Sequence, residues 1–155
     1  MKSDKIKVAS FNNRKKTLRV DYVSGKTARI HFSQIGIQDN ISEVWVDRET
    51  RGKSLGIRLI NGREEFMPYD QPLALIKDSD FLLQNHIEHV IAHIHKAITS
   101  KKISKRYLAE QLNTSDNQIQ RLLNPSILNK NLEQLYKIAT LLGLEMEWGV
   151  KKKVI

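Results

Sequence analysis

The stretch SKRYLAEQLNTSDNQIQRLL, residues 104–123, decides the fold of the second half of this chain. Apolar side chains follow helical spacing in each of two short segments within it. They are Leu108, Ala109 and Leu112 in the first segment, and Ile119, Leu122 and Leu123 in the second. Between the segments stands Asn113, a residue type that enters the left-handed conformation required by a sharp turn between helices. The spacing predicts two short helices that pack on each other across a tight turn.

Local chemistry marks the start of both helices. The hydroxyls of Ser104 and Ser115 are each placed to cap a helix by accepting a hydrogen bond from an otherwise unpaired backbone N–H group. Ala109 falls where two steeply crossing helices come closest, so we expect its small side chain to be a geometric requirement.

The second helix is expected to leave a polar set exposed. Its members are Asp116, Asn117, Gln118, Gln120 and Arg121. Asn and Gln pair bidentately with adenine and Arg with guanine, while Gln and Arg also contact phosphates. Asp116 can accept from cytosine or cap its own helix. The set predicts contacts to base edges in the major groove of duplex DNA.

With these residues the stretch resembles the helix-turn-helix domains of the Cro and phage-repressor class, also called XRE-like, over roughly residues 81–143. The shared pattern is Leu-Ala, three residues, a turn, several polar residues, then Ile and a polar pair. The resemblance implies a lambda-repressor-like all-α domain that places the polar set of the second helix in the major groove. The chain departs from the family at Asn113, where Gly is more frequent, and at the acidic Asp116.

Three residues are candidates for contacts to DNA phosphates. The resemblance places Lys105 at the start of the first helix, against the DNA backbone. Ser115 and Asn131 stand at predicted helix N-termini, where the helix dipole favours an anion.

The first half of the chain has the alternating pattern of strands. TLRVDYVSGKTARIHF, residues 17–32, and LGIRLINGREEFM, residues 55–67, each contain two alternating runs around a turn with Gly25 or Gly62. ISEVWV, residues 41–46, is a further strand candidate. We therefore expect residues 1–77 to form a small antiparallel β domain, a sheet of about five strands built from hairpins.

Residues 78–155 are predicted to form the helix-turn-helix domain, which makes the fold class α+β. A long helix is expected to begin with Asp80 as its cap, and a last helix to begin at Asn131 and end at Gly143. The tail LEMEWGVKKKV, residues 144–154, alternates like a terminal strand. Such a strand would pair within the protomer, pair with a second copy, or be a frayed tail.

Composition limits the function classes. The 155 residues include 26 Lys and Arg against 17 Asp and Glu, a net charge of +9 that favours a polyanionic partner. The chain has no cysteine, which excludes disulfides and thiolate metal sites. No apolar run is long enough to span a membrane, and the start of the chain lacks the apolar core of a secretory signal, so we expect a cytoplasmic protein without a membrane partner.

Two other clusters invite a chemical interpretation. His86, His89, His93 and His95 share one predicted helix, with the first three beside the apolar stripe and the last opposite. Packing at the boundary of the apolar stripe explains them better than a metal site, which normally has three or four rigid ligands. Glu43, Asp47 and Glu49 with Arg48 and Arg51 are best explained as solvated loop charges. We therefore expect no enzyme activity, no metal and no cofactor.

The sequence supports one main functional hypothesis and three alternatives. The main one is a repressor-like transcriptional regulator that binds double-stranded DNA as a homodimer. The first alternative is an antitoxin-type interaction protein, whose β domain binds a protein partner while the helical domain regulates its own promoter. The second is a helical domain that binds protein instead of DNA. The third, single-stranded RNA binding on the sheet, requires exposed aromatic side chains such as Tyr22, Phe32 or Trp45.

Overall fold

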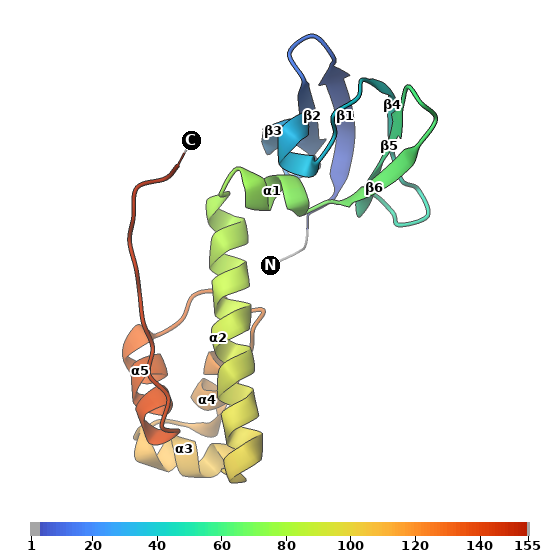
Figure 1. Cartoon of the computed structure of the whole chain (residues 1–155). Coiled ribbons are helices and arrows are strands. Elements are labelled where there is room, and N and C mark those ends of the chain that lie inside the picture. The colour runs from blue at the N-terminus through green and yellow to red at the C-terminus, as the bar shows by residue number, and fades with distance from the viewer. Residues whose placement is uncertain (1–3, 155) are drawn as a thin grey trace. The chain divides into compact units, whose positions relative to one another are not determined.

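The computed structural model describes residues 4–154 and has a mixed α+β fold (Figure 1). The strands are β1 (Ile6–Asn12), β2 (Thr17–Tyr22), β3 (Thr27–His31), β4 (Ile41–Val46), β5 (Ser54–Leu59) and β6 (Glu64–Pro68). The helices are the 3-10 helix η1 (Phe32–Ile35) and the α-helices α1 (Gln71–Leu75), α2 (Ser79–Lys101), α3 (Lys105–Gln111), α4 (Asp116–Leu122) and α5 (Leu132–Leu141). The chain divides into two compact units, one ending at Leu82 and the other beginning at Leu83, so the division falls within α2. The sequence instead predicts that the first domain ends at Lys77. Residues 1–3 and 155 of the two predicted domains lie outside the described residues.

The strands form two antiparallel sheets, in the orders β1-β2-β3 and β4-β5-β6. Both expected hairpins are present, because Gly25 (φ 93°) and Gly62 (φ 87°) supply the left-handed backbone that their turns require. The expectation of a single sheet of about five strands was wrong. Strand β1 was missed because its pairing is irregular between Ile6 and Val8, which interrupts the alternation that marks a strand.

The inner faces of the two sheets contribute to one apolar core. Leu18, Val20 and Leu55 are fully buried, and Ile30 and Ile57 are 1% exposed. On the other side of the β4-β5-β6 sheet, Trp45 lies across Gly56: a Cβ atom at position 56 would be 2.1 Å from the indole. Here a glycine is required by the close approach of a neighbouring side chain.

The start of α2 is held by a carboxylate and a lysine. The Asp78 carboxylate accepts a hydrogen bond of 3.0 Å from the backbone N–H of Phe81, so Asp78 caps the helix. Asp80, the expected cap, instead pairs with Lys26 at 2.7 Å, and Lys26 also pairs with Asp78 at 2.8 Å. The prediction for Asp80 was therefore wrong, because its carboxylate pairs with Lys26, which is distant in the sequence.

The second unit has its own core, in which α2 contributes Ile87, Ile91 and Ile94. Ile87 and Ile94 are buried on the apolar face of this helix, whereas Leu83 is 44% exposed. The other helices contribute apolar residues to the same core. These are Leu108 and Ala109 from α3, Ile119 and Leu122 from α4, and Leu135 and Ile138 from α5.

The expected β half followed by an all-α half with a terminal strand is matched only in part, because no strand follows α5 among residues 4–154. The α-helices lie in the middle of the chain, after the strands and before a tail at residues 144–154 that is neither helix nor strand. Leu144 and Met146 in the tail pack against the helical core, but none of the described strands pairs with the tail. An alternating pattern alone does not make a strand, because a strand needs a hydrogen-bonded neighbour.

Candidate nucleic-acid interface

A tight turn joins α3 to α4, as the sequence predicts. Asn113 has φ 52°, in the left-handed region. The turn is closed by two backbone hydrogen bonds, from Thr114 N–H to the Ala109 carbonyl at 2.9 Å and from Asn113 N–H to the Glu110 carbonyl at 3.2 Å. This pair of bonds satisfies carbonyl groups that the end of α3 would otherwise leave unpaired.

The three serine and asparagine caps expected in this unit are confirmed. Ser104 Oγ accepts a hydrogen bond from the Tyr107 N–H at 3.0 Å, and Ser115 Oγ accepts one from the Gln118 N–H at 3.2 Å. At the start of α5, the Asn131 side-chain oxygen accepts one from the Gln134 N–H at 3.1 Å. The Ser115 hydroxyl and the Asn131 amide nitrogen keep their hydrogens free to donate to a further acceptor.

The apolar side of α4 fixes its rotation on the unit. Ile119 is fully buried, Leu122 is 4% exposed, and Ala109 on α3 is 3% exposed. Since α-helical residues advance by about 100° each, burial of these positions turns Asn117 and Arg121 to the opposite side. Asn117 and Arg121 are one helical turn apart, so their side chains leave the same outer face.

The polar set predicted on α4 is exposed. Its five members are Asp116, Asn117, Gln118, Gln120 and Arg121. Their side chains make no hydrogen bond or ion pair with any of the residues from 4 to 154. This short, capped and packed helix therefore presents three side-chain amides and one guanidinium that have no hydrogen-bond partner within residues 4–154.

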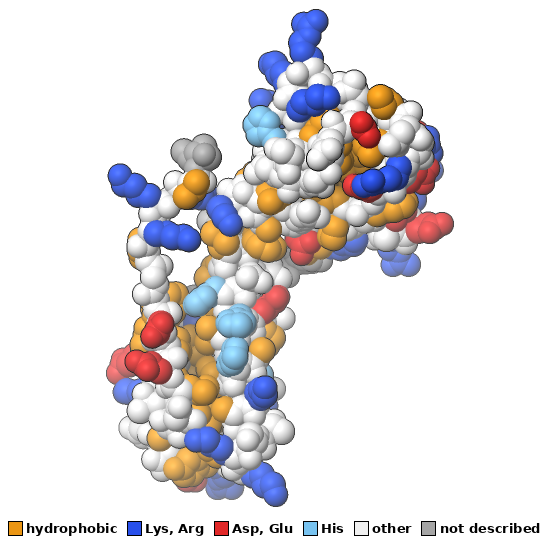
Figure 2. Space-filling view, viewed as in Figure 1, with side chains coloured by type: hydrophobic (Ala, Val, Ile, Leu, Met, Phe, Trp, Pro, Cys, Tyr) orange, Lys and Arg blue, Asp and Glu red, His pale blue; other side chains and the backbone are white. Residues whose placement is uncertain are grey.

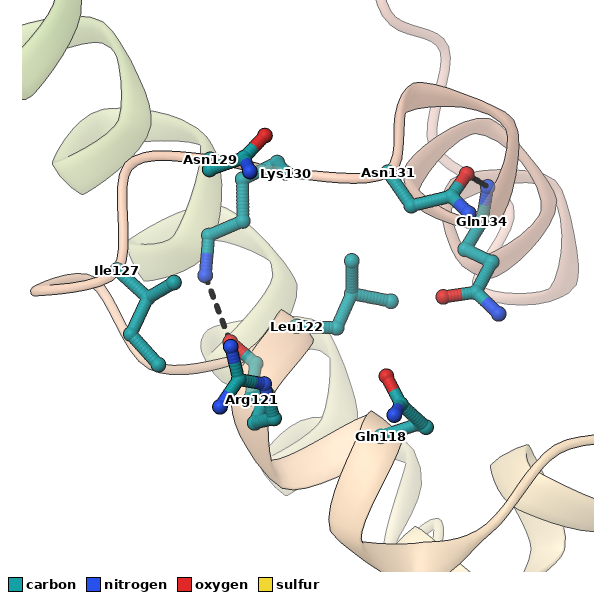
Figure 3. Close-up of a pocket in the computed structure, with 8 residues that line it drawn as sticks. All are labelled: Gln118, Arg121, Leu122, Ile127, Asn129, Lys130, Asn131 and Gln134. Atoms are coloured by element: carbon teal, nitrogen blue, oxygen red, sulfur yellow. Dashed lines mark hydrogen bonds between the residues drawn. The ribbon is translucent and has the colours of Figure 1, made fainter.

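A shallow polar pocket of about 130 Å³ lies beside this helix (Figure 3). Gln118 and Arg121 approach it from α4, and Asn131 and Gln134 approach it from the N-terminal end of α5. The loop between the helices contributes Lys130, with Ile127 and Asn129. The structure thus brings three predicted residues, Gln118, Arg121 and Asn131, together around one depression.

Lys130 also lines the pocket, although the sequence pattern did not predict it. Its ammonium donates hydrogen bonds to the carbonyl oxygens of Arg121 at 2.8 Å and Asn124 at 2.6 Å, which closes the C-terminal end of α4. Partial burial, together with the charge of Arg121, lowers the pKa of Lys130. A lysine directly before the Asn131 cap was the available signal, but its carbonyl partners depend on the path of the loop.

Not every predicted residue lies at the pocket. Asp116, Asn117 and Gln120 lie elsewhere on the exposed surface of α4, and Lys105 is exposed at the first position of α3. Lys105 and Ser115 stand at the N-terminal ends of the two successive helices, whereas Asn131 stands at the start of α5.

Among the four histidines of α2, His95 has a contact that the sequence did not predict. The Nε2–H group of His95, a residue expected to lie opposite the apolar stripe, donates a hydrogen bond of 3.0 Å to the Leu123 carbonyl oxygen. The His86 ring packs on Trp148 of the tail, with centroids 4.5 Å apart, and the exposed rings of His89 and His93 are also 4.5 Å apart. Among residues 4–154, no group of three or more His, Asp or Glu side chains is placed to hold a metal ion.

The aromatic side chains named for an RNA-binding sheet do not form an exposed row. Tyr22 and Phe32 are each 1% exposed and belong to the core, and the Tyr22 hydroxyl donates to the Tyr69 carbonyl at 2.6 Å. Trp45 alone of the three reaches the surface, where it is half-buried and in edge contact with Phe66. This arrangement lacks the stacked platform that single-stranded RNA requires.

No family model matches the chain, and no curated protein and no solved structure is significantly similar to it. None of the helices formed by residues 4–154 has both the length and the apolar character needed to cross a membrane.

Proposed function

We propose that this protein binds duplex DNA in a sequence-dependent manner, with α4 in the major groove, and acts as a transcriptional regulator. One observation carries the proposal: Asn117, Gln118, Gln120 and Arg121 are exposed on a capped helix and uncommitted within the described chain. Amide and guanidinium groups held in this way match the donor and acceptor pattern of purine edges. The packing of Ile119 and Leu122 limits the rotation of the helix, so little ordering is required when it binds.

Charge and the helix termini support phosphate contacts around the same helix. Residues 83–155 contain 11 Lys and Arg against 6 Asp and Glu. We assign three groups to contacts with the DNA backbone: Lys105, the Ser115 hydroxyl and the Asn131 amide. Each of them keeps hydrogen-bond donors available for a phosphate. Such contacts position the helix, whereas the side chains of α4 select the sequence.

The proposal includes a two-fold dimer. One short helix contacts only a few base pairs, and useful specificity normally comes from two half-sites about one helical turn of DNA apart. We therefore expect the preferred DNA sequence to be a palindrome.

The test is selection of a preferred duplex from a random pool, followed by binding measurements in a salt series. The variant is Asn117→Ala/Arg121→Ala, and the matched control is Asn85→Ala/Lys137→Ala, which removes one amide and one cation from exposed positions on α2 and α5. We expect an enriched palindrome for the wild type and the control, and loss of enrichment for the variant. The observed binding constant should fall steeply with salt in all three proteins.

Absence of wild-type binding at low salt would contradict the proposal, and so would an unchanged sequence preference in the Asn117→Ala/Arg121→Ala variant. In the first case the exposed polar helix would serve another partner. In the second case duplex DNA would be bound through a surface other than α4.

A further inference from the structure

The charge of the strand-built unit is divided unevenly between its two sheets. Residues 4–31, which contain β1, β2 and β3, carry eight Lys and Arg but only two Asp. Residues 32–82, which contain β4, β5 and β6, carry six Lys and Arg against nine Asp and Glu. Figure 2 shows basic side chains gathered over the loop between β1 and β2, whereas acidic and basic side chains are mixed over the other sheet.

The strand register places cations on the outer face of the β1-β2-β3 sheet. Leu18, Val20 and Ile30 point into the core, so the residues between them point outward. Arg19 on β2 stands directly opposite Arg29 on β3, and both are exposed. The exposed Arg14 and Lys15 lie in the turn that joins β1 to β2. We call Arg14, Lys15, Arg19 and Arg29 the basic face.

Little within the unit neutralises the basic face. The carboxylate beside it, Asp21, is shared between Arg19 at 3.2 Å and the Thr27 hydroxyl at 2.6 Å. The Thr27 hydrogen bond, with the charges of Arg19 and Arg29, lowers the pKa of Asp21. Like charges directly opposite on neighbouring strands destabilise a sheet, and Asp21 supplies only one negative charge beside the facing pair Arg19 and Arg29.

The other sheet provides the contrast. Its outer arginines are matched by acids: Arg58 pairs with Glu43 and with Glu64, and Arg63 pairs with Glu65. These guanidiniums are satisfied within the unit. The excess positive charge is therefore a property of the β1-β2-β3 sheet and not of antiparallel strands in this protein generally.

We propose that the basic face binds the phosphate backbone of duplex DNA. The partner follows from charge complementarity, because two facing guanidiniums and the cations of the adjoining turn match a regular row of phosphates. This proposal rests on the DNA-binding function proposed for α4, and it gives the strand-built unit a sequence-independent share in the same complex. It assigns affinity to the basic face and sequence preference to α4.

The test compares full-length variants on a random-sequence duplex across a salt series. Arg19→Gln/Arg29→Gln removes two charges from the basic face, and Arg14→Gln/Lys15→Gln does the same in the turn, which keeps the test valid if the first variant is poorly folded. The control Arg58→Gln/Arg63→Gln removes the same charge from the other sheet. Each face variant should reduce the slope of the logarithm of the binding constant against the logarithm of salt concentration by about 2. The control should retain the wild-type slope, and the sequence selected from a pool should be unchanged in all of them.

The outcomes separate this proposal from the one for α4. Suppose that both folded variants of the basic face keep the wild-type salt slope, while Asn117→Ala/Arg121→Ala loses its sequence preference. The proposal for the basic face would then be wrong, and the function proposed for α4 would stand. Binding that depends on the basic face but has no sequence preference would support the face and contradict the function of α4. Absence of duplex binding, or tighter binding to single-stranded RNA of the same length, would overturn the assignment of duplex DNA to the basic face.

Discussion

The Ser115 hydroxyl oxygen accepts a hydrogen bond of 3.2 Å from the backbone N–H of Gln118. This bond caps α4, yet it uses only the oxygen of Ser115, so the hydroxyl hydrogen remains available to a phosphate. The structural and binding roles proposed for this residue can therefore be separated by substitution.

Two substitutions at Ser115 are expected to have different effects. Ser115→Ala removes the cap and should lower the free energy of unfolding by about 1 kcal/mol. Ser115→Asp retains a capping oxygen, so stability should stay near that of the wild type, but its charge should repel phosphate and weaken duplex binding. Urea denaturation and binding anisotropy measure the two effects. If Ser115→Asp binds DNA as tightly as the wild type, the N-terminus of α4 does not approach phosphates.

The left-handed backbone at Asn113 predicts an order of stabilities. Asn113→Gly should be at least as stable as the wild type, because glycine adopts φ 52° without strain. Asn113→Val should lower the free energy of unfolding by about 1–2 kcal/mol, because a branched side chain is strained there. Urea midpoints give the order. Equal midpoints for the Gly and Val variants would show that the turn is not left-handed in solution.

Asp78 and Asp80 differ in role although both pair with Lys26. Asp78→Ala removes a helix cap and an ion pair, and we expect a loss of about 1–2 kcal/mol in the free energy of unfolding. Asp80→Ala removes an exposed ion pair only, and the expected loss is below about 0.5 kcal/mol. Thermal denaturation compares the two proteins, and equal losses would contradict the assignment of the cap to Asp78.

The contribution of Asp78 should depend on pH. Partial burial raises the pKa of Asp78, but hydrogen bonds from Lys26 and from the Phe81 N–H outweigh it, and the pKa is lowered overall. A carboxyl whose pKa is lowered by folding stabilises the protein above its unfolded pKa of about 3.9, and this stabilisation disappears as the pH falls through the folded pKa. The stability difference between wild type and Asp78→Asn should thus be present at neutral pH and shrink in acid. A difference that grows in acid would contradict this sign.

Gly56 is predicted to be required by Trp45. Gly56→Ala would place a Cβ atom 2.1 Å from the indole, so Trp45 must move away from the sheet. We expect a loss of about 1–3 kcal/mol in the free energy of unfolding and a red-shifted tryptophan emission. The measurement is made in a Trp148→Phe background, which leaves Trp45 as the emitter. The control is Gly149→Ala in the protein that retains Trp148. No atom lies within 4 Å of a Cβ added at Gly149. Unchanged emission in Gly56→Ala would show that Trp45 does not lie across Gly56.

Features set by local chemistry could be predicted from the sequence. Ser104, Ser115 and Asn131 were identified as caps because each oxygen bonds a backbone N–H group only three residues ahead. The same holds for Asn113 and for the exposure of the polar set on α4, since helical spacing alone separates this set from Ile119 and Leu122.

Features set by distant parts of the chain could not be predicted in this way. Asp80 was mistaken for the cap of α2 because its pairing with Lys26 is invisible in local sequence. The division into two sheets depends on which strands pair, and the irregularity between Ile6 and Val8 hides the first of them. The tail alternates as a strand does, but no described strand pairs with it. Lys130 was missed because its carbonyl partners are brought to it by the path of the loop after α4.

The most direct test of the central claim is a base-pair substitution scan of the selected duplex with wild type and Asn117→Ala. We predict that the wild type loses about 1–3 kcal/mol of binding free energy when one particular base pair of each half-site is changed. Asn117→Ala should bind equally well with any base at that position while keeping its other preferences. An identical pattern of base preferences in the two proteins at every position would show that Asn117 on α4 does not contact the bases, and would contradict the proposed function.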